Sequence, residues 1–371
     1  MKKILKNLID RLPLLNWIVF ESKPDFSDNT KYVFMEMINR KLYKKYKFIW
    51  LVSDPESAAL PKFPNTIYVK EGSRRARFYL NLSKALISCN EVHTSFRQKQ
   101  YLLFLGHGTA IKSVKAYYNL PDRVDNFLVA SEGTVELLAN ELNAPIEKAV
   151  VLGYPRNDEF SRPERDLKPL FPDKDFEKII IWYPTFRQHK NGQLKSRGSS
   201  LPIIHDREIA EKVNEFAKER KILIVLKPHF AQDVSEIKDL GLSNIVFIND
   251  KFYVDNNITS YEFVAASDAL ITDYSSIYYD FLLKDKPIAV VWEDLEEYKE
   301  NPGIAVDLDV YLAGAEKVYN LPDMLTFLNN LATANDILKA ERAKVCDLVN
   351  ISRDGKNSER VTDYIIKKIS K

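Results

Sequence analysis

The sequence predicts an α/β protein built as two doubly wound, Rossmann-like domains that face a cleft. The chain has 371 residues, which is long for one hydrophobic core and sufficient for two. Short apolar runs alternate with helix-like segments from one end to the other. A polar stretch with three prolines, residues 161–177, separates two series of these elements and has the composition of a linker.

The predicted strands are mostly continuous apolar runs, as expected of strands that are buried on both faces of a parallel sheet. Strand–helix alternation of this length is typical of doubly wound domains. In the first half the strands are residues 17–21, 48–53, 66–69, 101–105, 127–130 and 150–152. In the second half they are 179–183, 222–227, 245–248, 269–272 and 287–292. Helix-like segments between them include 30–46, 132–142, 207–219 and 275–283.

These elements predict an N-terminal domain over residues 1–160 and a C-terminal domain over residues 178–345. The polar tail, residues 346–371, is predicted to form a helix that can pack back on the first domain. No internal repeat at solenoid periods is found.

Composition and charge exclude several classes of protein. The net charge is only +2, which argues against a generally basic protein that coats nucleic acid. Cys89 and Cys346 have no second cysteine at metal-ligand or redox spacing, so a reducing cytoplasm is the simplest compartment. The longest apolar run near the start, residues 14–20, is too short to span a bilayer and lacks the cleavage site of a secretory signal.

His107 follows the predicted strand 101–105 and is therefore expected at its carboxyl end, where ligands bind in open α/β sheets. There it could accept a proton from an attacking hydroxyl near neutral pH. The alternative is a surface-loop histidine without function. The neighbours of His107 in the stretch LGHGTAIK are flexible or polar, which argues against that alternative. These neighbours are Gly106, Gly108, Thr109 and Lys112.

Two later motifs also close predicted strands. In LKPH, Lys227 and His229 could neutralise a phosphoryl group as charge develops, although His229 could instead cap a neighbouring element. In ITDYSS, Asp273 ends a strand, and Ser275 and Ser276 open a helix whose free N–H groups suit phosphate binding. Simple helix capping by one of the serines is the competing interpretation.

Two further segments are weaker signals when taken alone. WYPTFR follows the first strand of the second domain, where Arg187 could clamp a diphosphate and Thr185 could add a hydroxyl. GYPRND, residues 153–158, follows the last strand of the first domain and reads only as a well-formed turn.

Taken together, HGTAIK, GYPRND, WYPTFR, LKPH and ITDYSSIYYDFLLKDKPIAVV resemble the CDP-glycerol glycerophosphotransferase family in order and approximate spacing. That family contains teichoic-acid primases and polymerases and related capsule polymerases. The opening IVFES resembles its first strand, so the resemblance runs from about Trp17 to Trp292. The chain departs from the family pattern beside both histidines, at Gly106, Ala110 and Phe230.

The resemblance implies a GT-B fold and attack of an acceptor hydroxyl on the β-phosphate of a CDP-activated alditol, with release of CMP. It implies that His107 is the base and His229 the phosphate stabiliser, with an acceptor side at Gly108, Thr109 and Lys112. It places the donor in the C-terminal domain, on Arg187, Thr185, Lys227, Asp273, Ser275 and Ser276, with Asp280 as a ribose or supporting contact. No metal or other cofactor is required, because His, Lys, Arg and a helix terminus can supply the positive field.

Membrane contact is expected at the N-terminus. Residues 1–12 place five apolar side chains on one helical stripe and basic side chains elsewhere, a pattern suited to an anionic membrane surface. A helix that packs its stripe on the domain is the alternative. A second stretch that mixes charge with aromatic rings, residues 74–79, could extend the same surface. Because the family's acceptors are lipid-linked, peripheral attachment to the inner face of the cell membrane is the expected location.

Two other functions stay open at this stage. An ordinary GT-B glycosyltransferase would break a sugar–oxygen bond, and a carboxylate base in the first domain would favour it over His107. A non-catalytic scaffold would retain the fold without needing either histidine. Glycerol, ribitol and sugar phosphates remain alternatives as the transferred group, as do primase and polymerase activity and any oligomeric state.

Overall fold

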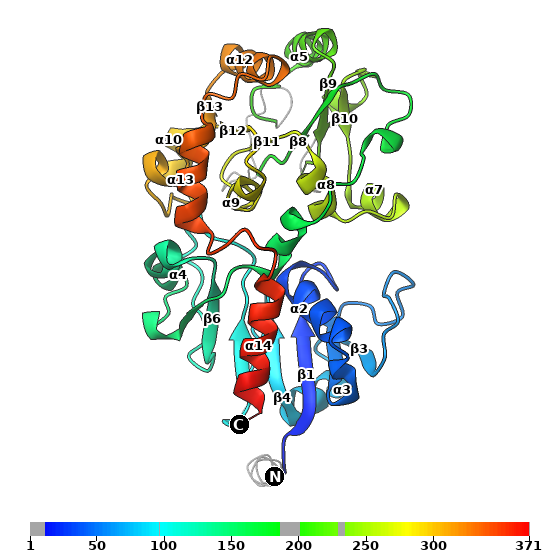
Figure 1. Ribbon diagram of the computed structural model, residues 1–371, viewed down its shortest axis with the longest axis vertical. Coiled ribbons are helices and arrows are strands. Elements are labelled where there is room, and N and C mark those ends of the chain that lie inside the picture. The colour runs from blue at the N-terminus through cyan, green and yellow to red at the C-terminus, as the bar shows by residue number, and fades with distance from the viewer. Residues whose placement is uncertain (1–11, 96, 186–200, 229–233, 371) are drawn as a thin grey trace. The chain divides into compact units, whose positions relative to one another are not determined.

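The computed structural model describes residues 12–95, 97–185, 201–228 and 234–370 (Figure 1). The chain divides into two compact units. Unit 1 consists of Met1–Thr109, Lys115–Asp158 and Asn350–Lys371, and unit 2 consists of Ala110–Val114 and Glu159–Val349. Arg187, His229 and the predicted amphipathic helix, apart from Leu12, lie outside the described residues.

Unit 1 is built on a seven-stranded parallel sheet with the order β3-β2-β1-β4-β5-β6-β7. The strand order reverses between β1 and β4, which makes their carboxyl ends the switch point of the sheet. The strands are β1 Leu15–Glu21, β2 Lys47–Val52, β3 Thr66–Lys70, β4 Ser83–Ser88, β5 Tyr101–Phe104, β6 Asn126–Val129 and β7 Ala149–Val151.

Successive side chains of each strand point to opposite faces of the sheet, so apolar strands need cover on both sides. On one face, helices α2 (Asp28–Asn39) and α14 (Asn357–Ile369) bury an apolar stripe against β1, β2 and β4. On the other face lie α3 (Arg74–Leu82) and α4 (Val135–Glu141). Short 3-10 turns complete the unit: η1 Leu42–Lys44, η2 Glu132–Thr134, η3 Ile146–Lys148 and the first part of η4 Pro155–Ser161, whose last three residues belong to unit 2.

Unit 2 is built on a six-stranded parallel sheet with the order β10-β9-β8-β11-β12-β13. This is the doubly wound order of a dinucleotide-binding domain, and its switch point lies between β8 and β11. The strands are β8 Lys178–Trp182, β9 Ile222–Leu226, β10 Ile245–Phe247, β11 Ala269–Thr272, β12 Ile288–Val291 and β13 Glu316–Val318.

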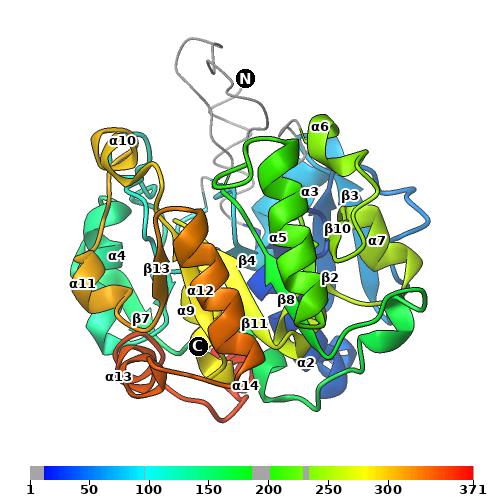
Figure 2. The same cartoon turned by 90° about the horizontal axis from the view of Figure 1, so that it is seen from above.

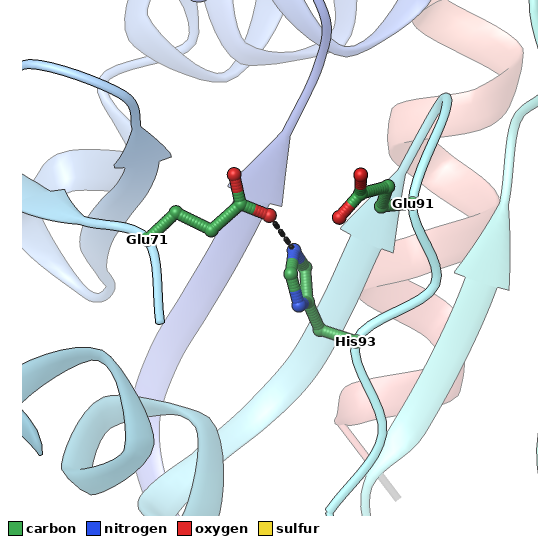
Figure 3. A group of neighbouring side chains, drawn as sticks. All are labelled: Glu71, Glu91 and His93. Carbon is green, nitrogen blue, oxygen red and sulfur yellow. Dashed lines mark ion pairs between the residues drawn. The ribbon is translucent and has the colours of Figure 1, made fainter. Parts of the chain in front are cut away.

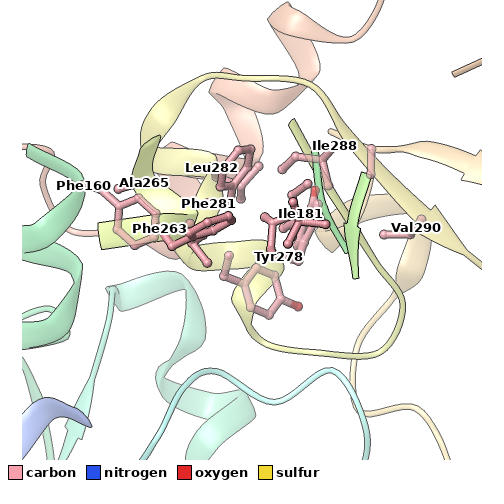
Figure 4. Packing of buried hydrophobic residues seen from close by; sticks show 14 of the residues in the cluster. Phe160, Ile181, Phe263, Ala265, Tyr278, Phe281, Leu282, Ile288 and Val290 are labelled. Carbon is pink, nitrogen blue, oxygen red and sulfur yellow. The ribbon is translucent and has the colours of Figure 1, made fainter. Parts of the chain in front are cut away.

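Two helical layers cover the sheet of unit 2. Helices α5 (Arg207–Glu219) and α12 (Leu321–Ala332) lie side by side on one face (Figure 2). The other face carries α8 and α9, whose aromatic and aliphatic side chains pack on Ile181, Ile288 and Val290 (Figure 4). The remaining bounds are η5 Lys168–Leu170, α6 Ser235–Lys238, α7 Asp250–Asp255, α8 Ser260–Ala266, α9 Ile277–Phe281, η6 Leu282–Lys284, α10 Leu295–Glu300, α11 Leu308–Tyr311 and α13 Lys339–Val349.

Local sequence signals mark where several of these helices begin. Asp206 caps α5 by accepting a hydrogen bond from the N–H of Ile209. Thr259 and Glu262 form a reciprocal capping box at the start of α8. Asn320 caps α12, whose first turn also contains a proline.

The structure differs from the sequence-based expectation in several places, and the predicted helix 30–46 is α2, which ends at Asn39, followed by η1. Strands β4 and β13 are additional to the predicted strands. The predicted linker, residues 161–177, belongs to unit 2, because Leu167, Phe171 and Phe176 enter its core. The predicted helix 275–283 is a five-residue α-helix, α9, followed by the 3-10 turn η6. Within the described residues, no helix is both long and apolar enough to cross a membrane.

Candidate active site

The switch point of unit 2 joins two of the predicted motifs. Thr185 lies just beyond β8, and Asp273 follows β11 directly. The backbone N–H of Thr185 donates to Oδ2 of Asp273 at 2.8 Å, and the Thr185 hydroxyl donates to Oδ1. Asp273 is 1% exposed and also accepts from the N–H of Tyr274 at 2.7 Å. Its carboxylate therefore ties the two strand ends together and holds the loop that follows β11.

Ser275 and Ser276 lie in that loop, immediately before α9, and both are partly exposed. Ser276 is the N-cap residue, but its side chain makes no capping hydrogen bond. The turn is instead held by backbone carbonyls: that of Ser275 accepts from Tyr278, and that of Ser276 accepts from Tyr279. Helix capping by the Ser276 hydroxyl is thus not observed. Both serines directly precede the first residues of α9, and the N–H groups at the start of a helix bind an anionic oxygen favourably.

Lys227 follows β9, the strand next to β8. Its Nζ lies 3.0 Å from Oδ1 of Asp250 and 5.9 Å from the ring centroid of Tyr183. The Asp250 side chain is 78% exposed, whereas that of Lys227 is 19% exposed, so Asp250 can move into water and leave the ammonium group to another anionic partner. Beneath it the hydroxyls of Tyr183 and Tyr253 lie 2.7 Å apart, and burial raises the pKa of both, so they remain protonated donors.

A second pair of residues, which the sequence analysis missed, supports the serine loop. The hydroxyl of Tyr274 donates to Oδ1 of Asp294 at 3.0 Å, and its ring stacks on Tyr298 with 3.5 Å between centroids. Asp294 and Tyr298 are four residues apart, the spacing of neighbours on one helical face, and both lie at α10. That spacing was the only signal in the sequence. It indicates that a polar and an aromatic side chain share one face of a helix, but it does not indicate that Tyr274 packs on that face.

Asp280, predicted as a ribose or supporting contact, is 1% exposed. Its Oδ2 accepts from the hydroxyl of Tyr261 at 2.7 Å, which links α9 to α8. This arrangement favours a supporting role, because the carboxylate presents almost no surface to a ligand.

In unit 1, His107 is exposed and follows β5, two residues after Leu105. It lies between two glycines with positive φ, Gly106 at 62° and Gly108 at 131°. The loop is held by Asn29 at the start of α2, which is fully buried. The Nδ2 group of Asn29 donates to the carbonyl of Gly106 at 2.9 Å. A rigid support thus presents an exposed imidazole at the carboxyl edge of the sheet.

The other predicted acceptor-side residues differ in their exposure to solvent. Thr109 is buried, and its hydroxyl has no hydrogen-bond partner among the described residues. Lys112 is exposed, and its backbone pairs with Ile304 in an isolated antiparallel bridge. Residues Ala110–Val114 belong to unit 2, so the HGTAIK motif begins in unit 1 and ends in unit 2.

The GYPRND turn, which looked unremarkable alone, has a structural role in unit 1. The guanidinium group of Arg156 lies 2.9 Å from Oδ1 of Asp28, beside the Asn29 support of the His107 loop. Asp158 accepts from the backbone N–H groups of Asn357 and Ser358 at 2.7 and 2.8 Å, and so caps α14. The motif therefore connects the His107 loop and the C-terminal helix to the end of the sheet.

Comparisons with known proteins agree with this architecture. The model of a family described as CDP-Glycerol:Poly(glycerophosphate) glycerophosphotransferase matches residues 7–367. A teichoic acid glycerol-phosphate transferase of Staphylococcus aureus is 24% identical over 97% of this chain and 95% of its own. A teichoic acid poly(glycerol phosphate) polymerase of Staphylococcus epidermidis is 25% identical over 76% of this chain and 41% of its own. The chain thus spans about two fifths of that relative, and 59% and 61% of two teichoic-acid primases.

Solved structures of the wall teichoic acid polymerase TagF share the fold. One matches with a TM-score of 0.77 and 21% identity, over all of this chain and 95% of its own. Another, a histidine-to-asparagine variant soaked with CDPG, matches with a TM-score of 0.73 over 93% of its length, also at 21% identity. The GT-B-like pair of parallel-sheet α/β domains predicted from the sequence is confirmed.

Proposed function

The chain belongs to the CDP-glycerol:poly(glycerophosphate) glycerophosphotransferase family, and on that premise we propose that it transfers an alditol phosphate from a CDP-activated donor. The acceptor is a hydroxyl of a lipid-linked saccharide or a growing polymer in the synthesis of teichoic acid or a related cell-surface polysaccharide. Glycerol phosphate is the favoured group, since the two staphylococcal relatives above are both named for glycerol phosphate.

The observation that carries the proposal is the convergence of three strand ends in unit 2. Thr185, Lys227 and the loop of Asp273 follow β8, β9 and β11, which are neighbours in the sheet. Within this small area lie an ammonium group, two serine hydroxyls and the N–H groups at the start of α9. All are donors or cations, as a diphosphate requires.

In the proposed reaction, the acceptor oxygen forms a bond to the β-phosphorus of the donor as the bond from that phosphorus to the CMP oxygen breaks. His107 accepts the proton of the acceptor hydroxyl. Lys227, Ser275 and Ser276 bind the diphosphate and stabilise the charge that moves onto CMP, with Arg187 and His229 proposed for the same task. Asp273 and Tyr274 act indirectly, by holding the serine loop.

Phosphotransfer is proposed to run without a metal, because these groups supply the positive charge themselves. Activity should then persist when a chelator such as EDTA is present throughout the assay. Loss of CMP release in EDTA, restored by Mg²⁺, would contradict this part of the proposal.

We also propose peripheral attachment to the cytoplasmic face of an anionic membrane. On α3 of unit 1, Arg74, Arg75, Arg77 and Phe78 point outward, and the Phe78 side chain is 54% exposed. Leu12 is likewise exposed. Residues 1–12 would add the apolar stripe described above. Full-length protein is expected to sediment with anionic liposomes and not with neutral ones; failure to sediment with either would end this proposal.

The test of function is release of CMP, followed by chromatography, from CDP-glycerol or CDP-ribitol and a lipid-linked disaccharide analogue. We expect acceptor-dependent CMP, with losses of 10²-fold or more in His107→Ala and His229→Ala. Ser275→Ala together with Ser276→Ala should act mainly by raising KM for the donor. His205→Ala is the matched control, because His205 pairs with Glu293 at 2.6 Å and is not among the residues proposed for the reaction.

The alternatives make different predictions in the same assay. A nucleotide-sugar glycosyltransferase would release no CMP from either alditol donor and would transfer the sugar of a nucleotide sugar. A scaffold would support polymer synthesis in cells equally well with His107→Ala. Either result, with a folded protein, would overturn the proposal.

A further inference from the structure

A separate polar cluster lies at the carboxyl edge of the sheet in unit 1 and consists of Glu71, Glu91 and His93 (Figure 3). Glu71 directly follows β3, whereas Glu91 and His93 lie in the loop that follows β4. Their ligand atoms all lie within 4.8 Å of one another. We propose that this cluster binds one divalent transition-metal ion, which links the end of β3 to the loop after β4.

One pair within the cluster lies at a distance that fits two ligands of the same ion. Nε2 of His93 lies 3.0 Å from Oε1 of Glu71. This nitrogen is buried and has Glu71 as its partner across this distance. Two adjacent ligands bound at about 2.1 Å and at right angles lie roughly 3 Å apart, which matches this distance. The rotatable side chain of Glu91 can close the remaining gap.

A buried, unpartnered carboxylate oxygen provides an independent observation. Glu21, the last residue of β1, is 2% exposed. Its Oε2 accepts from three successive backbone N–H groups, at 3.2, 3.1 and 3.1 Å, which belong to residues 89–91. Its Oε1 has no partner among the described residues. A cavity of about 10 Å³ lies beside it; most of the lining residues are apolar, and Glu21, Ser88 and His93 are the polar ones.

Glu21 thus has two consequences for the cluster. Its three hydrogen bonds to the backbone of residues 89–91 hold the start of the loop that carries Glu91 and His93, so the backbone is fixed while the Glu91 side chain can still rotate. The other oxygen of Glu21, Oε1, is buried without a hydrogen-bond partner among the described residues. Burying a carboxylate costs free energy unless a positive group lies nearby. A metal ion at the cluster would supply that positive charge.

The site already attracts a cation from the protein itself. The ammonium group of Lys23 contacts Oε1 of Glu91 and lies 3.8 Å from Oε2 of Glu71. The Lys23 side chain is 47% exposed, so it can move into water when a metal ion binds. Lys23 therefore competes with the ion, and its removal should strengthen metal binding.

Two carboxylates and one imidazole suit Mn²⁺, Fe²⁺ or Zn²⁺, whereas Mg²⁺ and Ca²⁺ prefer oxygen ligands alone. Three protein ligands leave further coordination positions to water. The proposal does not depend on the phosphotransfer reaction, and the site plays no part in the proposed chemistry.

The experiment uses full-length protein freed of metal by chelator and titrated with MnCl₂, with free Mn²⁺ measured by electron paramagnetic resonance. We expect one saturable ion per chain. Affinity should fall at least tenfold in His93→Ala and in Glu91→Gln and should rise severalfold in Lys23→Gln. The control is His205→Ala, which breaks a histidine–glutamate pair that has no third ligand within the described residues.

The absence of saturable binding by the wild-type protein would overturn the proposal. So would Mn²⁺ affinities unchanged in His93→Ala and Glu91→Gln, because the ion would then bind elsewhere. Circular dichroism of each variant guards against simple unfolding. The gain in affinity of Lys23→Gln cannot arise from a folding defect, and its absence would equally count against the site.

Discussion

Asp158 offers a sharp test of how unit 1 retains its C-terminal helix. Its carboxylate accepts two hydrogen bonds, at 2.7 and 2.8 Å, from the N–H groups of Asn357 and Ser358. All three residues are buried, and the N-cap position of α14, Lys356, provides no side-chain cap of its own. Asp158 is therefore a helix cap supplied from a distant part of the sequence.

Replacing Asp158 with Ala removes the acceptor and leaves two buried N–H groups unpaired. A hydrogen bond to a charged group contributes about 1.5–3 kcal/mol, so the lower value for each bond gives about 3 kcal/mol. At 1.36 kcal/mol per factor of ten, this corresponds to roughly 150-fold faster local opening of α14. Asp158→Asn retains one acceptor oxygen and should show an intermediate effect.

The assay is hydrogen–deuterium exchange of peptides that cover residues 357–369. The control is Asp354→Ala, which removes an exposed ion pair with Arg360 near the same helix and should change exchange less than about fivefold. If the exchange of α14 in Asp158→Ala stays within fivefold of wild type, the capping role assigned to Asp158 is wrong.

Three further predictions concern stability and the donor site. Gly153→Ala should lower the free energy of unfolding of unit 1 by about 2 kcal/mol or more in urea titrations, because φ is +78° and a Cβ would lie 2.1 Å from Oδ1 of Asn357. Asp273→Asn should destabilise unit 2 by about 2 kcal/mol and raise KM for the donor, whereas an unchanged KM would refute its support of the serine loop. Arg360 lowers the pKa of Asp354 to about 2. The ion pair therefore adds a small amount to the free energy of unfolding above pH 4, and this contribution is lost as pH falls through 2. Asp354→Asn should remove this step from a titration of stability against pH.

The arrangement of strands was largely predictable from local pattern. Continuous apolar runs identified most strands of both sheets, because a strand that is buried on both faces leaves no polar alternation. Strand β4 was missed because it follows α3 without an intervening turn and begins with Ser83 and Lys84. Strand β13, with the sequence EKV, is a short edge strand whose polar residues resemble a loop.

The candidate site was located from the sequence only in part. Motifs at strand ends identified Thr185, Lys227 and the serines, because parallel strands bring their carboxyl ends to one edge. The pairing of Thr185 with Asp273 and the support from Asp294 and Tyr298 were not predictable, since the partners are distant in sequence and carry no mutual signal.

What the sequence by itself determined is therefore the class of fold, the order of its elements and the family of its motifs. The fold class and the order of most elements follow from periodicity along the chain, and the family follows from the resemblance of its motifs. Only the tertiary structure decided that GYPRND caps α14, that residues 161–177 enter a core, and that Glu21 fixes the loop of a second polar cluster. Each depends on hydrogen bonds or burial between segments far apart in sequence, and such pairings are chosen by chain packing and not by local propensity.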